Sequence, residues 1–370
     1  MNEPISGASM RTAFALAGLG GFNAHGAGFL AAARKWDIRP ELVTATSGQI
    51  LVLADWLRGD DDLKKNLISP SRDGNPIAQL QTILFGYPGV FKPAYPQTLA
   101  RFASWPNFKE SPLDILADRF LPAQQYVPDR PEQSFQIVAD TFNASPIGVL
   151  FNSYDLSTGK GVLYGNDAAR RVMPKVKAVP SRHAAALNNG GHDRRYVPDV
   201  SAETKIHPID AEAVKSALWL SLYGFQDMPR GSMDGAYHRS CIVSELHGYD
   251  RVFVARPLAN AWIDDAVPKN WFEVQDWQCE MWFSVGYKAE VDALRRINDL
   301  IEDGVITDRR FKKVDLVEIE PETPAGYFNY FVERNEVYDE AYRLSEEKFA
   351  ALGLSRPTSL PALAPAAGFE

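Results

Sequence analysis

The alternation of apolar segments in the first sixty residues constrains the fold more than any other feature of this sequence. Residues 13–17 form a short apolar run that ends at a glycine, as buried strands often do. Residues 24–36 carry apolar side chains at helical spacing, residues 42–46 form a second buried strand, and residues 48–57 predict a mostly apolar helix. This order predicts an α/β fold of three layers (α/β/α), with a mostly parallel central sheet and helices on both faces.

The rest of the chain predicts elements that extend the same sheet and its covering layers. Strands are predicted over residues 135–140, 148–152, 162–164, 251–255 and 314–319, and helices over 211–222, 285–303 and 338–352. Neither an internal repeat nor a linker divides the sequence, which indicates one domain over residues 12–352. Residues 355–370 form a proline- and alanine-rich tail without a core pattern.

Residues 60–135 differ in character from the sequence on either side. Prolines recur through this stretch, and aromatic residues are frequent, among them Phe85, Tyr87, Phe91, Tyr95, Phe102, Trp105 and Phe108. An insertion of this length that keeps its apolar content predicts a cap embedded in the domain rather than a linker. Its aromatic residues either line a substrate cleft or belong to an ordinary core, and periodicity does not decide between the two.

The charge balance argues against nucleic acid as the main partner. The formal net charge is −8 and the sequence pI is about 5.4, whereas phosphate binding needs a concentrated basic surface. A local basic cluster of Arg170, Arg171, Lys175 and Lys177 is interpreted as a solvated face.

The two cysteines, Cys241 and Cys279, provide neither a disulfide framework nor the spacing of a zinc site. They indicate a reducing compartment. No apolar run reaches the roughly 18 residues that span a bilayer. Residues 12–20 run straight into a glycine turn, so they predict a core strand rather than a signal peptide. We expect a cytoplasmic protein, with contact to a membrane surface left open.

Ser47 stands in the segment ATSGQ, where the second predicted strand meets a helix. A serine on such a turn is exposed at the carboxyl end of the sheet, above a helix N-terminus that favours developing negative charge. The motif alone leaves two interpretations open, because a serine before a helix is either an activated nucleophile or an ordinary N-cap.

Gly18, Gly20 and Gly21 form a loop between the first predicted strand and the helix that follows it. Glycines allow backbone N–H groups to converge on an anion. The dinucleotide fingerprint GxGxxG is broken at Asn23, and the sequence GxxxxGK[ST] does not occur. An oxyanion hole is therefore the better functional interpretation of the loop, and a tight turn without a ligand is the alternative.

Asp234 belongs to the segment MDGAY, which follows an apolar helix and a loop with Pro229 and Gly231. An Asp-Gly pair marks a turn in most sequences. A serine nucleophile, however, needs a base within hydrogen-bond reach, and this late aspartate is a candidate for that base.

Together these motifs resemble the patatin-like phospholipase family. The shared features are a glycine-rich loop after the first strand, a serine elbow after the second, and a late DG[GA], in the family's order and approximate spacing. The segments FNSYDLSTGKGVLYG and SALWLSLYGFQDMPRGSMDGAY are similar to the parts of the family that precede its Asp-Gly, and the C-terminal helix is similar to one bacterial branch. The resemblance covers roughly residues 12–352.

The resemblance implies a patatin-like fold and a catalytic dyad, with Ser47 as nucleophile and Asp234 as general base. Gly18, Gly20 and Gly21 match the loop whose N–H groups hold the tetrahedral oxyanion, where one donor is worth about 3 kcal/mol. The implied reaction transfers an acyl group from a lipid or other acyl ester to Ser47 and then hydrolyses the acyl-enzyme. The cap would supply apolar walls for the acyl chain. This chemistry calls for no metal and no organic cofactor.

Four positions depart from the family pattern GGGx[RK]G and from its elbow: Leu19, Phe22, Asn23 and Gln49. We expect Gly48 to accommodate the bulk of Gln49 by taking the strained backbone conformation. The departures keep two alternatives open beside an ester hydrolase. One is a catalytically inactive binding protein, and the other is an acyltransferase or thioesterase that uses the same serine.

His25, in the helix after the glycine loop, is either an auxiliary group for the oxyanion or leaving group, or a structural histidine. The other histidines show no metal spacing, and none lies late enough in the chain for the usual order of a Ser-Asp-His triad, so a dyad is favoured. The substrate head group, the acyl chain length and the oligomeric state are not predicted.

Overall fold

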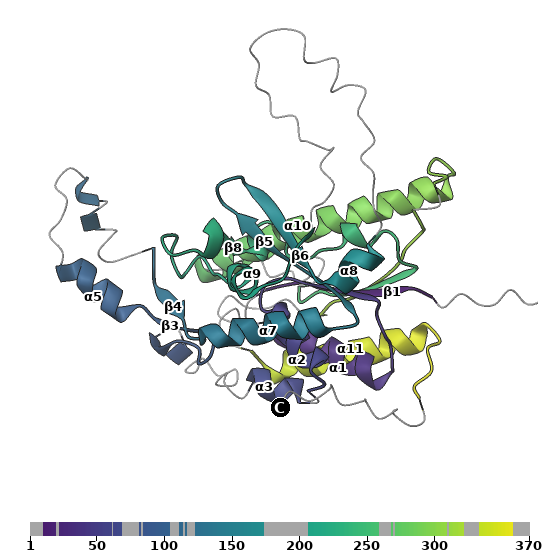
Figure 1. Ribbon diagram of the computed structural model, residues 1–370, viewed down its shortest axis with the longest axis horizontal. Coiled ribbons are helices and arrows are strands. Elements are labelled where there is room, and N and C mark those ends of the chain that lie inside the picture. The colour runs from purple at the N-terminus through teal and green to yellow at the C-terminus, as the bar shows by residue number, and fades with distance from the viewer. Residues whose placement is uncertain are drawn as a thin grey trace, which may run out of the picture.

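The computed structural model describes residues 10–19, 22–60, 62–68, 81–82, 84–103, 111–113, 115–116, 123–173, 206–258, 268, 271–308, 311–321 and 333–357. Its centre is an eight-stranded sheet (Figure 1). The strands are β1 (Thr12–Leu16), β2 (Leu42–Ala45), β5 (Gly148–Asp155), β6 (Lys160–Gly165), β7 (Ile206–His207), β8 (Ser232–Asp234), β9 (Arg251–Ala255) and β10 (Asp315–Ile319). The predicted strands over 13–17, 42–46, 148–152, 162–164, 251–255 and 314–319 are all present, with small differences at their ends.

The strand order is β10-β9-β1-β2-β5-β6-β7, and β8 pairs with the last residues of β5. All neighbouring pairs from β10 to β5 are parallel, whereas β6 and β8 run antiparallel to β5. The mostly parallel sheet predicted from the sequence is thus confirmed. Because β1, β2 and β9 all end at the same edge, the loops that follow them meet there.

Two apolar clusters cover the sheet because side chains alternate between its faces along each strand. Phe14, Leu16 and Val43 point to one face, where α1 (Asn23–Lys35), α2 (Gln49–Leu57), α7 (Glu132–Ala144), α9 (Ala211–Ala217) and α11 (Asn335–Ala351) pack. Ala13 and Ala15 point to the other face, which α8 (Asp167–Val172) and α10 (Trp271–Glu302) cover. Figure 1 shows α10 on one side of the sheet and α1, α2 and α11 on the other, which completes the three layers.

The strand predicted over residues 135–140 is wrong, because these residues belong to α7. The buried side chains of this helix are Phe135, Val138, Ala139 and Phe142, which lie at positions i, i+3, i+4 and i+7. That spacing places all four on one helical face. A six-residue window is too short to show the period, so its β-branched and aromatic residues resembled a strand.

Two predicted helices have different ends in the structure. The helix predicted over 211–222 ends at Ala217, after which the chain turns and the Trp219 carbonyl accepts the backbone N–H of Asp234. The helix predicted over 285–303 begins at Trp271 and is therefore much longer than its amphipathic C-terminal part alone. The predicted C-terminal helix is present as α11, and residues 358–370 of the predicted tail lie outside the described residues.

The described part of residues 60–135 contains α3 (Leu63–Ile68), α5 (Tyr95–Ala103) and a small antiparallel sheet of β3 (Phe91–Pro93) and β4 (Tyr126–Pro128). Its aromatic residues form a separate apolar cluster that joins this region to the loop before β8: Tyr87, Phe91, Tyr126, Trp219, Tyr223 and Met233. The backbone N–H of Tyr126 also donates to the Leu222 carbonyl at 3.0 Å. The region is thereby fixed beside the end of the strand that carries Asp234.

Candidate active site

Ser47 occupies a sharp turn between β2 and α2, with a backbone φ of 57°. This left-handed conformation costs a residue with a Cβ about 1–2 kcal/mol, and such strain is concentrated at functional sites. Gly48, which was expected to take the strained conformation, is instead in the right-handed helical region with a φ of −56°. The strain therefore falls on the serine itself, which is the geometry of a nucleophile elbow.

Asp234 and Ser47 meet because β8 and β2 run toward each other along the same edge of β5. β2 pairs with β5 as far as Ala45 opposite Phe151, and β8 approaches from the other end until Asp234 lies opposite Ser153. The Ser47 hydroxyl donates to Oδ2 of Asp234 at 2.5 Å. Two residues that are far apart in the sequence are thus brought together by one strand that both β2 and β8 flank.

Asp234 is 1% exposed. Burial raises the pKa of its carboxyl to about 7, and this effect outweighs the hydrogen bonds from the Ser47 hydroxyl and the Ala236 backbone N–H, which lower it. A carboxyl with this pKa is a stronger base than an exposed aspartate and is still ionised in a large fraction of molecules near neutral pH.

Asn152 of β5 links the two halves of the site, and sequence reasoning missed it. Its Oδ1 accepts a hydrogen bond from Thr46 Oγ1 at 3.0 Å, on the Ser47 side. Its Nδ2 donates to the carbonyls of Gly235, at 3.3 Å, and Arg239, at 3.0 Å, on the Asp234 side. A polar residue in the middle of a buried strand was the signal that could have found it.

Gly18 lies against the elbow but does not have the free N–H expected of an oxyanion donor. Its backbone N–H donates to the Ser240 carbonyl at 2.8 Å. A Cβ at this position would lie 2.3 Å from the Thr46 carbonyl oxygen, so Gly18 is required for close packing. Gly20 and Gly21, the other two predicted donors, lie outside the described residues.

The backbone N–H of Gly48 is a further candidate donor to an oxyanion, in addition to the three glycines predicted from the sequence. It is positioned at the N-terminus of α2 and borders the same cavity as Ser47. Within the described ranges this N–H has no hydrogen-bond acceptor. The N–H of the residue after the nucleophile is one of the two donors in α/β-hydrolase oxyanion holes.

The four departures from the family pattern each have a packing role in this chain. Leu19 and Phe22 are buried in a small apolar cluster with Leu258 and Val337. The Gln49 side chain fits against α1 at Gly26, where a Cβ would lie 2.0 Å from Gln49 Oε1. Asn23, the fourth, begins α1 and donates its side-chain amide to Glu333 at 2.9 Å.

Glu333 is a second buried carboxyl that borders the same cavity as Ser47, and no motif around it indicated this role. It accepts the backbone N–H groups of Asn23, at 3.0 Å, and Ala24, at 2.8 Å, at the start of α1. Burial raises its pKa to about 7, while these hydrogen bonds lower it. The Glu333 carboxylate, which is distant in sequence from α1, thus accepts hydrogen bonds from backbone N–H groups that have no acceptor within the helix.

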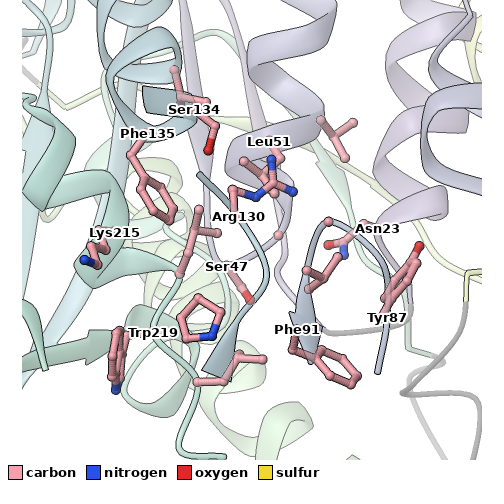
Figure 2. A pocket seen from close by; sticks show the side chains of 18 of the residues that line it. Asn23, Ser47, Leu51, Tyr87, Phe91, Arg130, Ser134, Phe135, Lys215 and Trp219 are labelled. Carbon is pink, nitrogen blue, oxygen red and sulfur yellow. The ribbon is translucent and has the colours of Figure 1, made fainter. Parts of the chain in front are cut away.

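Ser47 and Asp234 border a cavity of about 610 Å³. Figure 2 shows Ser47 among the side chains that line it. Its walls are mainly apolar and come from α2, α7, the β3–β4 region and the loop before β8, and they include Leu51, Val52, Phe91, Phe135, Val138 and Trp219. Some aromatic residues of the 60–135 region therefore line the cavity while also packing in a local core.

The histidines of the described chain do not border this cavity. His25 is buried within α1, and its Nε2 lies 2.9 Å from the Ile319 carbonyl oxygen. Burial lowers its pKa to about 4, so the ring is neutral. This placement supports the structural interpretation of His25 over the auxiliary one. His238 stacks on Tyr154, and His247 contacts the Ser244 carbonyl.

No helix in the described part of the chain is long and apolar enough to cross a membrane. No family model matches the chain, and no curated protein does so either. The solved structures similar to it include the crystal structure of VipD from Legionella pneumophila. That similarity has 11% identity and a TM-score of 0.32, and it covers 92% of this chain and 67% of the VipD chain. A likeness this weak carries no argument about fold or function.

Proposed function

We propose that this protein is a serine hydrolase that cleaves carboxylic esters through a Ser47–Asp234 dyad. The observation that carries the proposal is the 2.5 Å hydrogen bond from the Ser47 hydroxyl to the buried Asp234 carboxylate, formed on a strained elbow that opens into a cavity. A strained turn, an adjacent base and an open cavity are the features that an activated nucleophile needs.

In the proposed reaction, Ser47 Oγ attacks the ester carbonyl carbon while its proton passes to Oδ2 of Asp234. The negative charge that develops on the carbonyl oxygen is stabilised by backbone N–H groups, with Gly48 as one donor. The tetrahedral intermediate collapses and the leaving alkoxide takes the proton from Asp234. A water molecule then gives a proton to Asp234 and attacks the acyl-enzyme. As the second tetrahedral intermediate collapses, Ser47 Oγ leaves and takes this proton from Asp234, which releases the acid and restores the free enzyme.

The acyl group is proposed to be a hydrocarbon chain, as in a lipid. The apolar walls contributed by Leu51, Val52, Phe135 and Val138 would bury such a chain, and about 25 cal/mol is gained for each Å² of apolar surface removed from water. The order of glycine loop, serine elbow and Asp-Gly makes a patatin-like lipid acyl hydrolase the family we propose, with the 60–135 region as its cap.

A catalytically inactive binding protein of the same fold is the second candidate. The Gly18 N–H is already bonded to the Ser240 carbonyl, which leaves the glycine loop with one donor fewer for an oxyanion. Transfer of the acyl group to an alcohol or from a thioester would use the same dyad, and product analysis with water, alcohol and thiol acceptors separates these reactions from hydrolysis.

The test is intact-mass analysis after treatment with a fluorophosphonate, which bonds covalently only to activated serines. We expect one adduct on the native protein, none on Ser47→Ala, and slow labelling of Asp234→Asn. Ser134→Ala is the matched control, because Ser134 borders the same cavity but its hydroxyl donates to the Pro131 carbonyl and not to a carboxylate. Absence of an adduct on the folded native protein would favour the binding protein.

A further inference from the structure

Three basic side chains border the cavity that holds Ser47: Arg58, Arg130 and Lys215. Lys215 forms an ion pair with Glu132, and Arg58 forms one with Asp55. Arg130, in contrast, has no hydrogen bond or ion pair with any residue of the described ranges. The carboxylate whose charge acts on Arg130 is Asp55, the partner that Arg58 already holds.

Arg130 has no carboxylate partner of its own among the described residues. The charge of Asp55 acts on both guanidinium groups, but its ion pair is formed with Arg58. Asp55 is partly buried, and burial raises the pKa of its carboxyl, which weakens its hold on either arginine at lower pH. An arginine keeps its charge throughout the physiological range.

Arg130 is half-buried, and Tyr87 and Tyr223 act on it electrostatically beside Asp55. Tyr87, Tyr223 and Pro131 border the same cavity. Figure 2 shows the Arg130 side chain among the groups that line the cavity, which also include Leu51 and Ser47. A guanidinium has five donors, and leaving them unpaired in a partly dry site costs free energy that an anionic ligand would recover.

We propose that Arg130 binds an anionic group carried by the ester substrate, so that the substrate class is a carboxylic ester with a carboxylate or phosphate beside its apolar chain. The inference rests on the proposed function and makes Arg130 a specificity-determining residue. The planar guanidinium matches two oxygens of either anion, which gives orientation as well as affinity. An ester held at Arg130 by its charged end and at Ser47 by its carbonyl lies in one defined direction.

The anion can belong to the acyl side or the alcohol side of the ester, and two substrate pairs distinguish these sources. On the acyl side, the mono-p-nitrophenyl ester of adipic acid is compared with p-nitrophenyl hexanoate. On the alcohol side, dihexanoyl phosphatidic acid is compared with dihexanoylglycerol. For each pair the quantity measured is the ratio of kcat/KM for the anionic ester to kcat/KM for the neutral one.

We expect Arg130→Gln to lower this ratio about 10- to 100-fold in at least one pair, the range expected for a charge-assisted hydrogen bond. Asp55→Asn removes the competing carboxylate and is expected to raise the ratio. Lys215→Gln removes a cavity cation that is already paired, and its ratio is expected to change by less than about threefold. Arg130→Lys replaces the glutamine variant if that variant does not fold. We expect an intermediate fall in the ratio, because lysine keeps the positive charge but cannot bind two oxygens as the planar guanidinium does.

Unchanged ratios in both pairs for the arginine variants would overturn the proposal while leaving the hydrolase intact. Fluorophosphonate labelling and neutral-ester turnover report the proposed function separately. If the native protein shows neither, thermal unfolding with added adipate or hexanol tests the anion site alone. A rise in Tm with adipate in the native protein that is absent in Arg130→Gln would support the anion site even where the hydrolase fails. Absence of a rise in the native protein would overturn the anion site.

Discussion

Gly235 packs against the side-chain amide of Asn152 so closely that a Cβ on the glycine would lie 2.3 Å from Asn152 Cγ. Gly235 does not have a positive φ, so its backbone conformation does not require a glycine. A larger residue is excluded by the close contact with Asn152. The contact fixes the backbone that follows Asp234. It explains why a glycine must come directly after the base in this chain.

Gly235→Ala is therefore expected to move Asp234 away from Ser47 and to slow fluorophosphonate labelling. Overpacking of a buried contact costs typically about 1–3 kcal/mol, so the free energy of unfolding should fall by that amount. Gly286→Ala is the control, because a Cβ there meets no atom within 4 Å and alanine favours the helix. Equal behaviour of the two variants would show that the Asn152 contact does not constrain the site.

The labelling rate of Ser47 is expected to rise with pH through about 7 and then reach a plateau. Only ionised Asp234 can accept the proton of Ser47, and burial raises the pKa of this carboxyl to about 7. The pKa of Glu333 is also raised to about 7, so either carboxyl could set the midpoint of the profile. The Glu333→Gln variant shows which of the two does so. A profile that keeps its midpoint in Glu333→Gln belongs to Asp234, and a rate independent of pH between 5 and 9 would contradict the base role.

Asp234→Asn is expected to stabilise the fold at alkaline pH while removing activity. Folding raises the pKa of Asp234 from 3.8 to about 7. The stability that its protonation contributes is therefore fully present below about pH 3.8 and is lost as the pH rises through about 7. At pH 8 the difference corresponds to at most roughly 4 kcal/mol. Urea unfolding at pH 4 and pH 8 should show the gain of the asparagine variant only at the higher pH.

Glu333→Ala is expected to lower the free energy of unfolding by about 2–4 kcal/mol, because it leaves two backbone N–H groups and the Asn23 amide without their acceptor. Glu336→Ala removes an exposed carboxylate from the first turn of α11 and should cost about 0.5 kcal/mol. Chemical unfolding at pH 5, below the raised pKa of Glu333, compares the two without the cost of a buried charge. Similar losses would mean that Glu333 does not hold the start of α1.

The sequence predicted the parallel half of the sheet because each of its strands is a short apolar run next to an amphipathic helix. It could not predict that β8 meets β2 along β5, because β8 has three residues and its pairing is set by a long-range contact. Asn152 and Glu333 were missed for the same reason, since each acts on backbone groups distant in sequence. Residues 135–140 were wrongly predicted as a strand because they are rich in residues that favour strands. The helical spacing of the buried side chains becomes visible only when the residues up to Phe142 are included.

The strain on Ser47 gives a prediction that depends on backbone conformation alone. A φ of 57° suits glycine and costs alanine about 1–2 kcal/mol, whereas glycine gives up more chain entropy on folding, typically about 0.5–1 kcal/mol. Ser47→Gly is therefore expected to be more stable than Ser47→Ala by up to about 1.5 kcal/mol. Both variants lose the hydroxyl, so the hydrogen bond to Asp234 cancels from the comparison.

Ser216 gives the reverse order and serves as the control. It is a buried serine inside α9, where the helix favours alanine over glycine by about 1 kcal/mol. Urea unfolding of the four variants should place Ser47→Gly above Ser47→Ala and Ser216→Gly below Ser216→Ala. If alanine is the more stable substitution at both positions, then Ser47 does not carry the left-handed strain, and the elbow geometry on which the nucleophile assignment depends would fail with it.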